Sequence, residues 1–364
     1  MYELTYNGHL AIIPLVLYIL MLVRYKNIFQ QTERYTNTYE WLVIYILLVL
    51  SSVFASESHD TYHYMEGYEL SKVDGGYYED IYRYFAQITN NYFEWRFFIW
   101  GLASVFILLA TYILRLDFAY LGFVIPVFFL TQFVITRGAL GFSFLMFTTI
   151  CFTSYLSKGK GLKNIILLAL SFVGMIYSMN LHRSIVIYLV LLPLSVLIPI
   201  KKITLKTSLI LFPLFYVSAV YLLNTFSGLE VLNDRQEFIQ GYAALEEINL
   251  SLNGFIRVYI ERLPWYIFGF IMIYRMSSET NRPIRVLCKY SFLLLYISAI
   301  TFRQEAIGPW LSTRTIHAAS FPLLFCATYY LKNYKLERWT KISIALFIVT
   351  VFLYHFLVNI LNWW

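Results

Sequence analysis

Apolar residues occur along this chain in long, nearly uncharged runs that are separated by short polar segments. A helix needs roughly 20 apolar residues to cross the hydrocarbon core of a bilayer, and most of the runs approach that length. We therefore predict an all-α polytopic integral membrane protein, a single membrane domain over residues 1–364 with about twelve transmembrane helices. The predicted helices cover residues 4–23, 41–56, 97–114, 119–135, 138–157, 164–181, 184–200, 207–223, 263–274, 290–302, 315–331 and 342–364.

The amino-acid composition indicates the same class of protein. Of the 364 residues, 59% are hydrophobic and 13% are charged, and the mean hydropathy is +0.63, which is outside the range of ordinary soluble domains. The pI near 9.0 arises from short loops, so it predicts membrane orientation rather than nucleic-acid binding. Cys151 and Cys326 lie in apolar runs and Cys288 lies in a basic loop, so we expect no disulfide and no cysteine-based metal site. The N-terminal residues lack the pattern of a cleaved signal peptide, and the first run is expected to remain as a membrane helix.

The basic residues alternate between loops in a way that predicts the orientation of the chain. Eighteen of the 28 Lys and Arg residues fall in every second gap between apolar runs, and 16 of the 21 Asp and Glu residues fall in the other gaps. Lys and Arg are concentrated in cytoplasmic loops, and a missed or false helix would scramble the alternation. Both termini are then expected outside the cytoplasm. The residues assigned to the cytoplasmic side are Arg24, Lys26, Arg34, Arg115, Lys158, Lys160, Lys163, Lys201, Lys202, Lys206, Arg275, Arg282, Arg285, Lys289, Lys332, Lys335, Arg338 and Lys341.

Two of the predicted extracytoplasmic loops are long, namely residues 57–96 and 225–262. The first is acidic and rich in tyrosine, and apolar side chains at helical spacing within it predict an amphipathic helix on the outer membrane surface. The second leads into the run 263–274, which at roughly 1.5 Å per residue is too short to cross the bilayer. That helix must begin earlier, which places Arg257, Glu261 and Arg262 at membrane depth. The residues that form the amphipathic pattern are Tyr77, Tyr78, Ile81, Tyr82, Phe85 and Ile88.

Seven of the arginines outside the cytoplasmic loops stand near predicted helices, where the orientation rule does not place cations. Several lie in short turns at 136–138, 182–184 and 303–317, which leave no room for a soluble domain, so we expect their side chains to point into the mouth of the bundle. Guanidinium groups bind phosphate through paired hydrogen bonds, and helix N-termini add to the attraction. We interpret the arginines as a site for an anionic, phosphate-bearing substrate; the alternative is that each caps a helix or pairs with a carboxylate such as Glu305. The seven residues are Arg137, Arg183, Arg235, Arg257, Arg262, Arg303 and Arg314.

One histidine is the best candidate for a catalytic base. His182 lies at a predicted helix break, and an imidazole with an ordinary pKa near 6.5 can accept a proton from a hydroxyl group near neutral pH. His317 is a weaker candidate because it begins an apolar run, and Asp60 and Glu305 are alternatives. The sequence contains no P-loop, GxSxG, HExxH or zinc-ligand spacing, and the first long loop has no DxD motif. We therefore expect neither a metal nor another cofactor.

Four short stretches of the chain carry a resemblance to a known family. They are residues 60–64 (DTYHY) followed by Tyr68, residues 75–78 (GGYY), residues 136–140 (TRGAL) and residues 180–184 (NLHRS). In this arrangement the chain resembles the EpsG-type branch of the Wzy polysaccharide polymerases. In that branch an Asp-to-Tyr stretch follows the second helix, an arginine opens a later helix, and an H-x-S element precedes another. The resemblance spans roughly residues 55 to 200, and the C-terminal half matches only in general character.

The resemblance implies a fold, an activity and a set of partners. It implies the GT-C type B glycosyltransferase architecture and a bacterial cytoplasmic-membrane (inner-membrane) enzyme that joins oligosaccharide repeat units outside the cytoplasm. The repeats would be carried on undecaprenyl pyrophosphate in the bilayer, with a flippase and a chain-length regulator as further implied partners. The family pattern carries over to Asp60, Arg137, His182 and Ser184. Arg183 departs from the commoner pattern, which has a less charged residue there, so its role stays open.

These observations lead to a mechanistic hypothesis. Arg137, Arg303 and Arg314 would hold the donor pyrophosphate and stabilise its charge as the bond to the anomeric carbon breaks, while His182 deprotonates the acceptor hydroxyl. Direct displacement would invert the anomeric centre. The other residues expected to bind substrate are Arg183, Ser184, Arg257, Arg262, Glu305 and His317.

Two other functions remain open. A ligase of the same architecture would transfer the finished glycan to another lipid or to a protein. A flippase or secondary transporter would move the same lipid-linked sugar, but such proteins tend to show repeated halves and charges on both faces of a central cavity. The sequence shows no internal repeat, and its candidate charges gather on one face.

Overall fold

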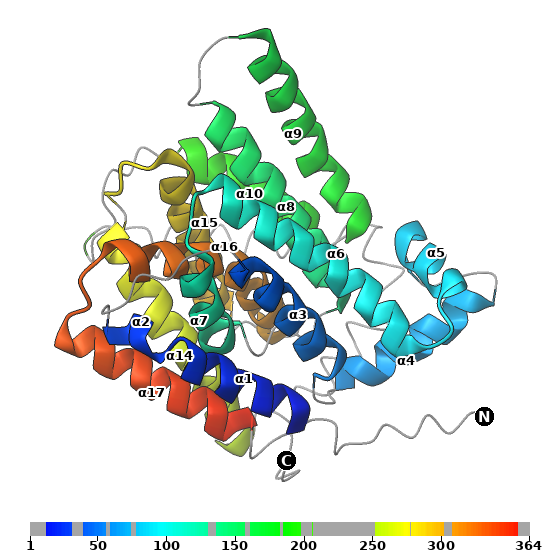
Figure 1. The fold of residues 1–364 in the computed structure, drawn as a ribbon. Helices are drawn as coiled ribbons and strands as arrows, with labels where there is room; N and C mark the ends of the chain where they lie inside the picture. The colour runs from blue at the N-terminus through cyan, green and yellow to red at the C-terminus, as the bar shows by residue number, and fades with distance from the viewer. Residues whose placement is uncertain are drawn as a thin grey trace. The chain divides into compact units, whose positions relative to one another are not determined.

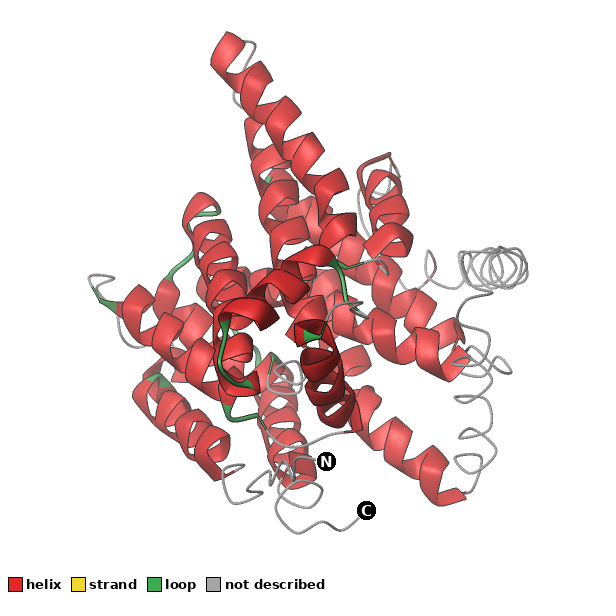
Figure 2. Cartoon of the chain, turned by 90° about the vertical axis from the view of Figure 1, so that its right-hand side faces the viewer, coloured by secondary structure: helices red, strands yellow, loops and turns green. Residues whose placement is uncertain are grey.

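The part of the chain that the computed structural model describes consists of helices joined by short turns and loops. It comprises residues 12–30, 39–55, 59–73, 78–129, 136–156, 161–182, 185–197, 206, 252–276, 278–301 and 308–355. Within these ranges there is no strand (Figure 2), so the all-α prediction is confirmed. The chain divides into two compact units, Met1–Val190 with Ala327–Trp364, and Leu191–Cys326.

The first unit contains most of the described helices, and Figure 1 labels them. Helices α10 (Ile185–Leu197) and α16 (Gly308–Asn333) each include residues of both units, and α14 (Leu252–Met276) and α15 (Arg282–Thr301) belong to the second. The helices of the first unit are α1 (Ile12–Arg24), α2 (Lys26–Gln30), α3 (Glu40–Val53), α4 (His59–Lys72), α5 (Asp80–Ile88), α6 (Tyr92–Ile113), α7 (Phe118–Phe128), α8 (Thr136–Tyr155), α9 (Leu162–Leu181) and α17 (Arg338–His355).

Three of the described helices are long and apolar enough to cross a membrane, namely α6, α8 and α9. Shorter apolar helices occur at Ile12–Arg24, Glu40–Val53, Phe118–Phe128 and Tyr188–Leu197. These properties are those of a helical membrane protein. The predicted helix at 207–223 lies outside the described residues, and the count of about twelve stays a prediction.

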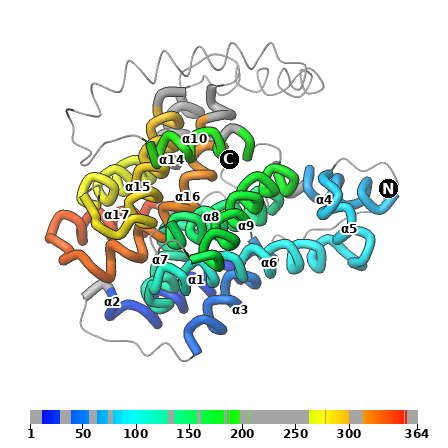
Figure 3. Tube along the Cα trace, turned by 90° about the horizontal axis from the view of Figure 1, so that it is seen from above, coloured from blue at the N-terminus to red at the C-terminus, as the bar shows by residue number. Residues whose placement is uncertain are grey.

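Helices α6, α8 and α9 pack side by side, with α8 in the middle (Figures 1 and 3). In α8, small hydroxyl side chains such as Ser143 and Thr149 are buried, which lets neighbouring helices approach closely. A Cβ atom at Gly174 of α9 would lie 2.7 Å from the Thr148 methyl group. The glycine is therefore part of the close contact between α8 and α9.

Several helices begin earlier than their apolar runs. Helix α14 begins at Leu252 instead of residue 263, which confirms that Arg257 and Arg262 lie within a helix. Helix α15 begins at Arg282, so our assignment of Cys288 to a loop was wrong; its Sγ lies 3.6 Å from that of Cys326. Charged residues such as Arg and Lys favour helix nearly as well as leucine does, so hydropathy alone misses these polar turns.

The two arginines placed in tight turns also lie within helices. Arg137 occupies the first turn of α8, and Arg314 lies in α16, which begins at Gly308. His317 follows in the same helix. The expectation of a short extracytoplasmic turn through this stretch was therefore wrong over residues 308–314, which are helical; proline near the helix start is compatible with helix initiation.

The first long loop folds into two helices, α4 and α5, beside the N-terminal end of α6 (Figure 3). Helix α4 was not predicted. Helix α5 was predicted, but as a helix whose apolar face rests on the membrane. This placement was wrong, because Tyr82 and Ala86 are buried and pack in the same cluster as Trp95 of α6. The apolar face of α5 packs against aromatic side chains of α4 and α6.

Trp95 is the centre of this aromatic cluster. Its ring stacks on Tyr78 at a centroid distance of 5.8 Å and contacts the rings of Tyr68 and Tyr92 at 5.9 and 5.7 Å. Its Nε1 donates a hydrogen bond of 3.0 Å to the carbonyl oxygen of Tyr82. Buried aromatic pairs add about 0.5–1.5 kcal/mol each beyond the burial of their area, so the cluster fixes α4 and α5 on α6.

Local capping explains why α6 starts at Tyr92, before its apolar run. The Asn91 side chain accepts a hydrogen bond of 2.9 Å from the backbone N–H of Glu94, and the Glu94 carboxylate accepts one of 2.8 Å from the N–H of Asn90. Such reciprocal bonds satisfy donors that a helix start would otherwise leave without partners. The early start brings Trp95 and Arg96 into the helix.

Replacing Gly67 by Ala is expected to destabilise this region. A Cβ atom there would lie 2.1 Å from Tyr78 Oη, which donates to the carbonyl oxygens of His63 and Tyr64. The ring of Tyr78 must then move out of its stack on Trp95, at a cost of about 1–3 kcal/mol. Thermal unfolding of the purified protein should show a lower midpoint. In Gly161→Ala the added Cβ meets nothing within 4 Å, and the change should be clearly smaller.

Candidate functional site

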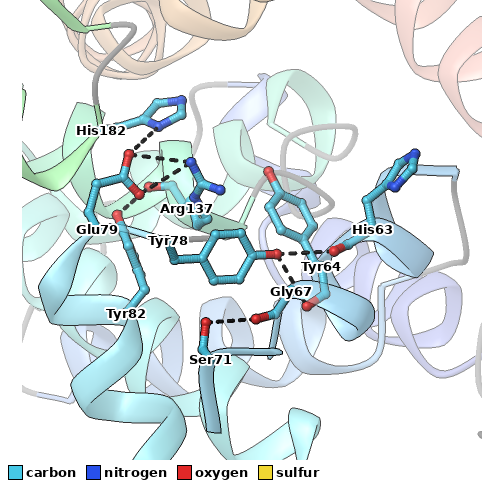
Figure 4. A network of polar contacts seen from close by, with 9 residues as sticks. All are labelled: His63, Tyr64, Gly67, Ser71, Tyr78, Glu79, Tyr82, Arg137 and His182. Atoms are coloured by element: carbon cyan, nitrogen blue, oxygen red, sulfur yellow. Dashed lines mark hydrogen bonds and ion pairs between the residues drawn. The ribbon is translucent and has the colours of Figure 1, made fainter. Parts of the chain in front are cut away.

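Three side chains from distant parts of the sequence meet in the first unit (Figure 4). Glu79 immediately precedes α5, Arg137 lies in the first turn of α8, and His182 ends α9. The guanidinium Nη2 of Arg137 lies 3.3 and 3.2 Å from Oε1 and Oε2 of Glu79. The Nδ1 atom of His182 lies 3.7 Å from Glu79 Oε1, which is an ion-pair distance and longer than a hydrogen bond. One carboxylate therefore contacts both the predicted anion-binding arginine and the predicted base.

The backbone places His182 at a break in the chain, as predicted. The residue ends α9 in an extended conformation, with its N–H donating to Ser178 at 3.2 Å and its carbonyl accepting from Ile185 at 2.9 Å. Gly141 of α8 faces this break. A Cβ atom there would lie 3.0 Å from the Cβ of His182 and 2.5 Å from Ile185 Cδ1, so glycine is what lets the break approach α8.

Two tyrosines enclose the guanidinium group of Arg137. Its Cζ lies 4.3 Å from the ring centroid of Tyr78 and 5.8 Å from that of Tyr82. Tyr82 Oη also donates a hydrogen bond of 2.7 Å to the carbonyl oxygen of Arg137. Burial raises the pKa of both phenols above the ordinary value, although the charge of Arg137 opposes the rise. Both are therefore neutral, and they act as aromatic walls and hydrogen-bond donors.

The carboxylate is charged despite its burial. Burial alone would raise the pKa of Glu79, but contact with His182 and the charge of Arg137 lower it to about 2. The side chains of Glu79 and Arg137 are each only 9% exposed, so solvent screens their attraction weakly. Arg137 Nε is buried and makes no hydrogen bond within the described part of the chain. The site thus combines a fixed carboxylate, an imidazole and a cation with a spare N–H group.

Several predicted residues near this site have no described side chain. Asp60 lies in the first turn of α4, but its side chain is outside the described set, as are Arg183 and Ser184 altogether. Of the residues carried over from the family resemblance, the structure brings together Arg137 and His182. The roles predicted for all four, including Asp60 and Ser184, stay predictions.

A second polar cluster lies within the other unit. Arg262 is buried, and its Nη1 donates a hydrogen bond of 2.9 Å to the Ser312 hydroxyl. That hydroxyl in turn donates to the carbonyl oxygen of Ser298 at 2.8 Å, and the Ser298 hydroxyl lies 2.9 Å from Tyr266 Oη. The imidazole of His317 lies close enough to Arg262 and Arg314 to interact with their charges. These three predicted residues of the second unit therefore lie near one another.

Four other predicted positions have side chains outside the described residues. They are Arg257, whose backbone lies in α14, and Arg235, Arg303 and Glu305, which lie outside the described residues altogether. The prediction that all the arginines line one shared pocket therefore stays a prediction.

Sequence reasoning missed two residues of the first unit. Glu79 directly follows the quoted GGYY stretch, but nothing in the sequence distinguishes it from the other extracytoplasmic carboxylates. Arg96 is fully buried, with its Cζ 5.8 Å from the ring centroid of Tyr92. The Asn91 and Glu94 caps were the available signal, since they predict that the helix begins before Arg96.

No cluster of three or more His, Cys, Asp or Glu side chains with metal-binding geometry occurs among the described residues. Comparison of the chain with models of protein families, with curated proteins and with solved structures finds no match. The functional argument therefore depends on the site itself.

The carboxylate of Glu79 should make the free energy of unfolding depend on pH. Its pKa falls from an ordinary 4.5 when unfolded to about 2 when folded, so ionisation contributes about 3 kcal/mol above pH 4.5. This contribution should be lost progressively as the pH falls from 4.5 towards 2. Unfolding midpoints measured across that range should decline less steeply in Glu79→Gln. Asp80→Asn, which changes an exposed neighbour, should follow the parent protein.

The hydroxyl of Ser312 is expected to stabilise the folded state of the second unit. In Ser312→Ala, a buried guanidinium N–H loses its acceptor, which costs about 1–3 kcal/mol. Denaturation monitored by tryptophan fluorescence should report this loss. Ser320 of the same helix donates only locally, to the carbonyl oxygen of His317, and an equal loss in Ser320→Ala would contradict the importance of the Arg262 contact.

Proposed function

We propose that this chain is a membrane glycosyltransferase that polymerises oligosaccharide repeat units carried on undecaprenyl pyrophosphate. The observation that carries the proposal is the meeting of Arg137, His182 and Glu79 at the ends of separate helices. An anion-binding group and a base side by side are what transfer from a diphosphate donor to a hydroxyl acceptor requires. The fold proposed with it is a bundle of about twelve membrane helices of the GT-C type B architecture.

The proposed orientation places this site outside the cytoplasm of a bacterium, with both termini on the same side. Two groups of residues that come together in the structure support this orientation. Arg137, Glu79 and His182 are all assigned to the extracytoplasmic side, and they meet. Arg115 and Lys332 are both assigned to the cytoplasmic side, and they line one hollow together with Trp41 and other residues.

The compartment determines the kind of donor. Nucleotide sugars are made inside the cell, so a sugar outside must arrive already activated on its lipid, and the diphosphate provides the leaving group. In the proposed reaction Arg137 binds that diphosphate, with Nε as a free donor beside the Nη2 group that Glu79 holds. Its charge stabilises the electrons that the leaving oxygen gains. Binding of the diphosphate by Arg303 and Arg314 as well stays a prediction.

His182 provides the base in this proposal. It removes the proton from the acceptor hydroxyl, whose oxygen then attacks the anomeric carbon as the bond to the diphosphate breaks. A single displacement inverts the anomeric centre. The reaction needs a bilayer that holds both lipid-linked partners, and a flippase and a chain-length regulator would act before and alongside it.

Two related functions compete with this proposal. A ligase would use the same chemistry on a different acceptor, and a strain lacking it would accumulate loose polymer instead of single repeats. A flippase or transporter would move the lipid-linked sugar without joining it. The purified chain in liposomes should elongate lipid-linked repeats; transport of the substrate without elongation would reject the enzymatic function.

Replacing Arg137 or His182 by Ala should lower elongation in liposomes by roughly 100-fold or more, because Arg137 stabilises the charge of the leaving diphosphate and His182 removes the proton of the acceptor. In cells the polymer ladder should shorten to single repeats on a gel. The matched controls are Arg83→Ala and His63→Ala, which change more exposed members of the same loop. Undiminished polymer length in Arg137→Ala or His182→Ala would refute the assignment.

A further inference from the structure

Glu79 does more than join α5 to α8 through its ion pair with Arg137, because it also lies close to His182. Its Oε1 atom lies 3.7 Å from His182 Nδ1 while the same carboxylate holds Arg137 at 3.2 Å. The side chain of His182 is 14% exposed, so the imidazole lies at the border between protein and solvent. Since Glu79 lies at Nδ1, the opposite ring nitrogen, Nε2, is the one that would meet the acceptor hydroxyl in the proposed reaction.

We propose that Glu79 is a positioning residue that acts through His182, orienting its ring and favouring its protonated form. The inference rests on the proposed function for its catalytic meaning, but the pairing itself can be measured without any reaction. The logic is that of a base oriented by a third group, which holds the imidazole in place and stabilises the imidazolium that forms.

The surrounding charges support this role. His182 and Arg137 act on the carboxylate of Glu79. The charge of Glu79 and the phenols of Tyr64, Tyr78 and Tyr82 act on Arg137 in turn. Burial keeps Tyr78 and Tyr82 neutral. The charged carboxylate of Glu79 lies at ion-pair distance from the ring of His182. Arg137 also keeps the carboxylate ionised, because a protonated glutamic acid would forfeit their attraction.

The proton and the electron pair can be followed through the proposed step. The acceptor O–H proton moves to Nε2 of His182, the oxygen forms the new bond to the anomeric carbon, and the old carbon–oxygen bond to the diphosphate breaks. The diphosphate leaves with the electron pair. The positive charge on His182 appears beside Glu79, which stabilises it, and water later takes the proton away.

The test is the titration of His182 in the full-length protein in lipid nanodiscs. With ¹³C-labelled histidine, the ring carbon signal of His182 is identified by its loss in His182→Gln. In Glu79→Gln its titration midpoint should fall by about one pH unit, since an opposite charge at ion-pair distance shifts a pKa by at least that much. Asp80→Asn, an exposed carboxylate one residue away, should leave the midpoint unchanged. An unchanged midpoint in Glu79→Gln would overturn the proposal.

A second variant guards against misfolding. Glu79→Asp keeps the charge but is one methylene shorter, so it should retain a midpoint close to that of the parent protein. If Glu79→Gln does not fold, the titration midpoint of His182 in Glu79→Asp decides the question. A midpoint that falls to the ordinary value of a solvent-exposed histidine would reject a directional contact between the two side chains. A midpoint near the parent value supports it.

Elongation assays separate this inference from the proposed function. The acid limb of the pH–rate profile should move to lower pH in Glu79→Gln, with a lower maximal rate, whereas a purely structural clamp would lower the rate equally at every pH. If the parent protein elongates nothing, the proposed function fails while the titration still decides the pairing. If the parent elongates and the profile of Glu79→Gln keeps its shape, the positioning role alone fails.

Discussion

The ion pair between Glu79 and Arg137 is the interaction on which the described site depends. A guanidinium removed from water loses much hydration energy, and only a close, well-placed anion compensates for it. Here that anion comes from a residue 58 positions earlier in the chain. Because the same carboxylate contacts His182, the end of α9 is fixed relative to α8 and α5 through one charged group.

The aromatic cluster around Trp95 makes this ion pair effective. Tyr78 lies with its ring parallel to Trp95 and 4.3 Å from the Arg137 guanidinium, so a single phenol joins the apolar cluster to the charge. Exclusion of water by these rings lowers the local dielectric and strengthens every attraction inside. The glycine at position 67 provides the space that the phenol needs. Packing and electrostatics are thus parts of one arrangement.

The sequence predicts the helices better than it predicts their ends or their contacts. Long apolar runs are sufficient for α6, α8 and α9, whereas the polar first turns of α15 and α16 carry no hydropathy signal. The break at His182 and the arginine opening α8 could be recognised from short motifs. Glu79 could not, because its role arises from a contact across the fold, and sixteen carboxylates share the predicted outer side. Helix α4 was missed for a related reason, since its stability comes from packing on Trp95.

A carboxylate beside the anion-binding arginine has a consequence for the proposed reaction. A bare guanidinium would already attract the diphosphate of the bound donor, and attraction that is equal in the ground state and in the transition state does not accelerate the chemical step. With Glu79 in place, the charge of Arg137 is balanced until the leaving group develops additional negative charge. The same carboxylate then faces the imidazolium as it forms, so both charges created in the transition state meet a partner already in position. In the proposed reaction, the arrangement would stabilise the separation of charge more than the bound substrate.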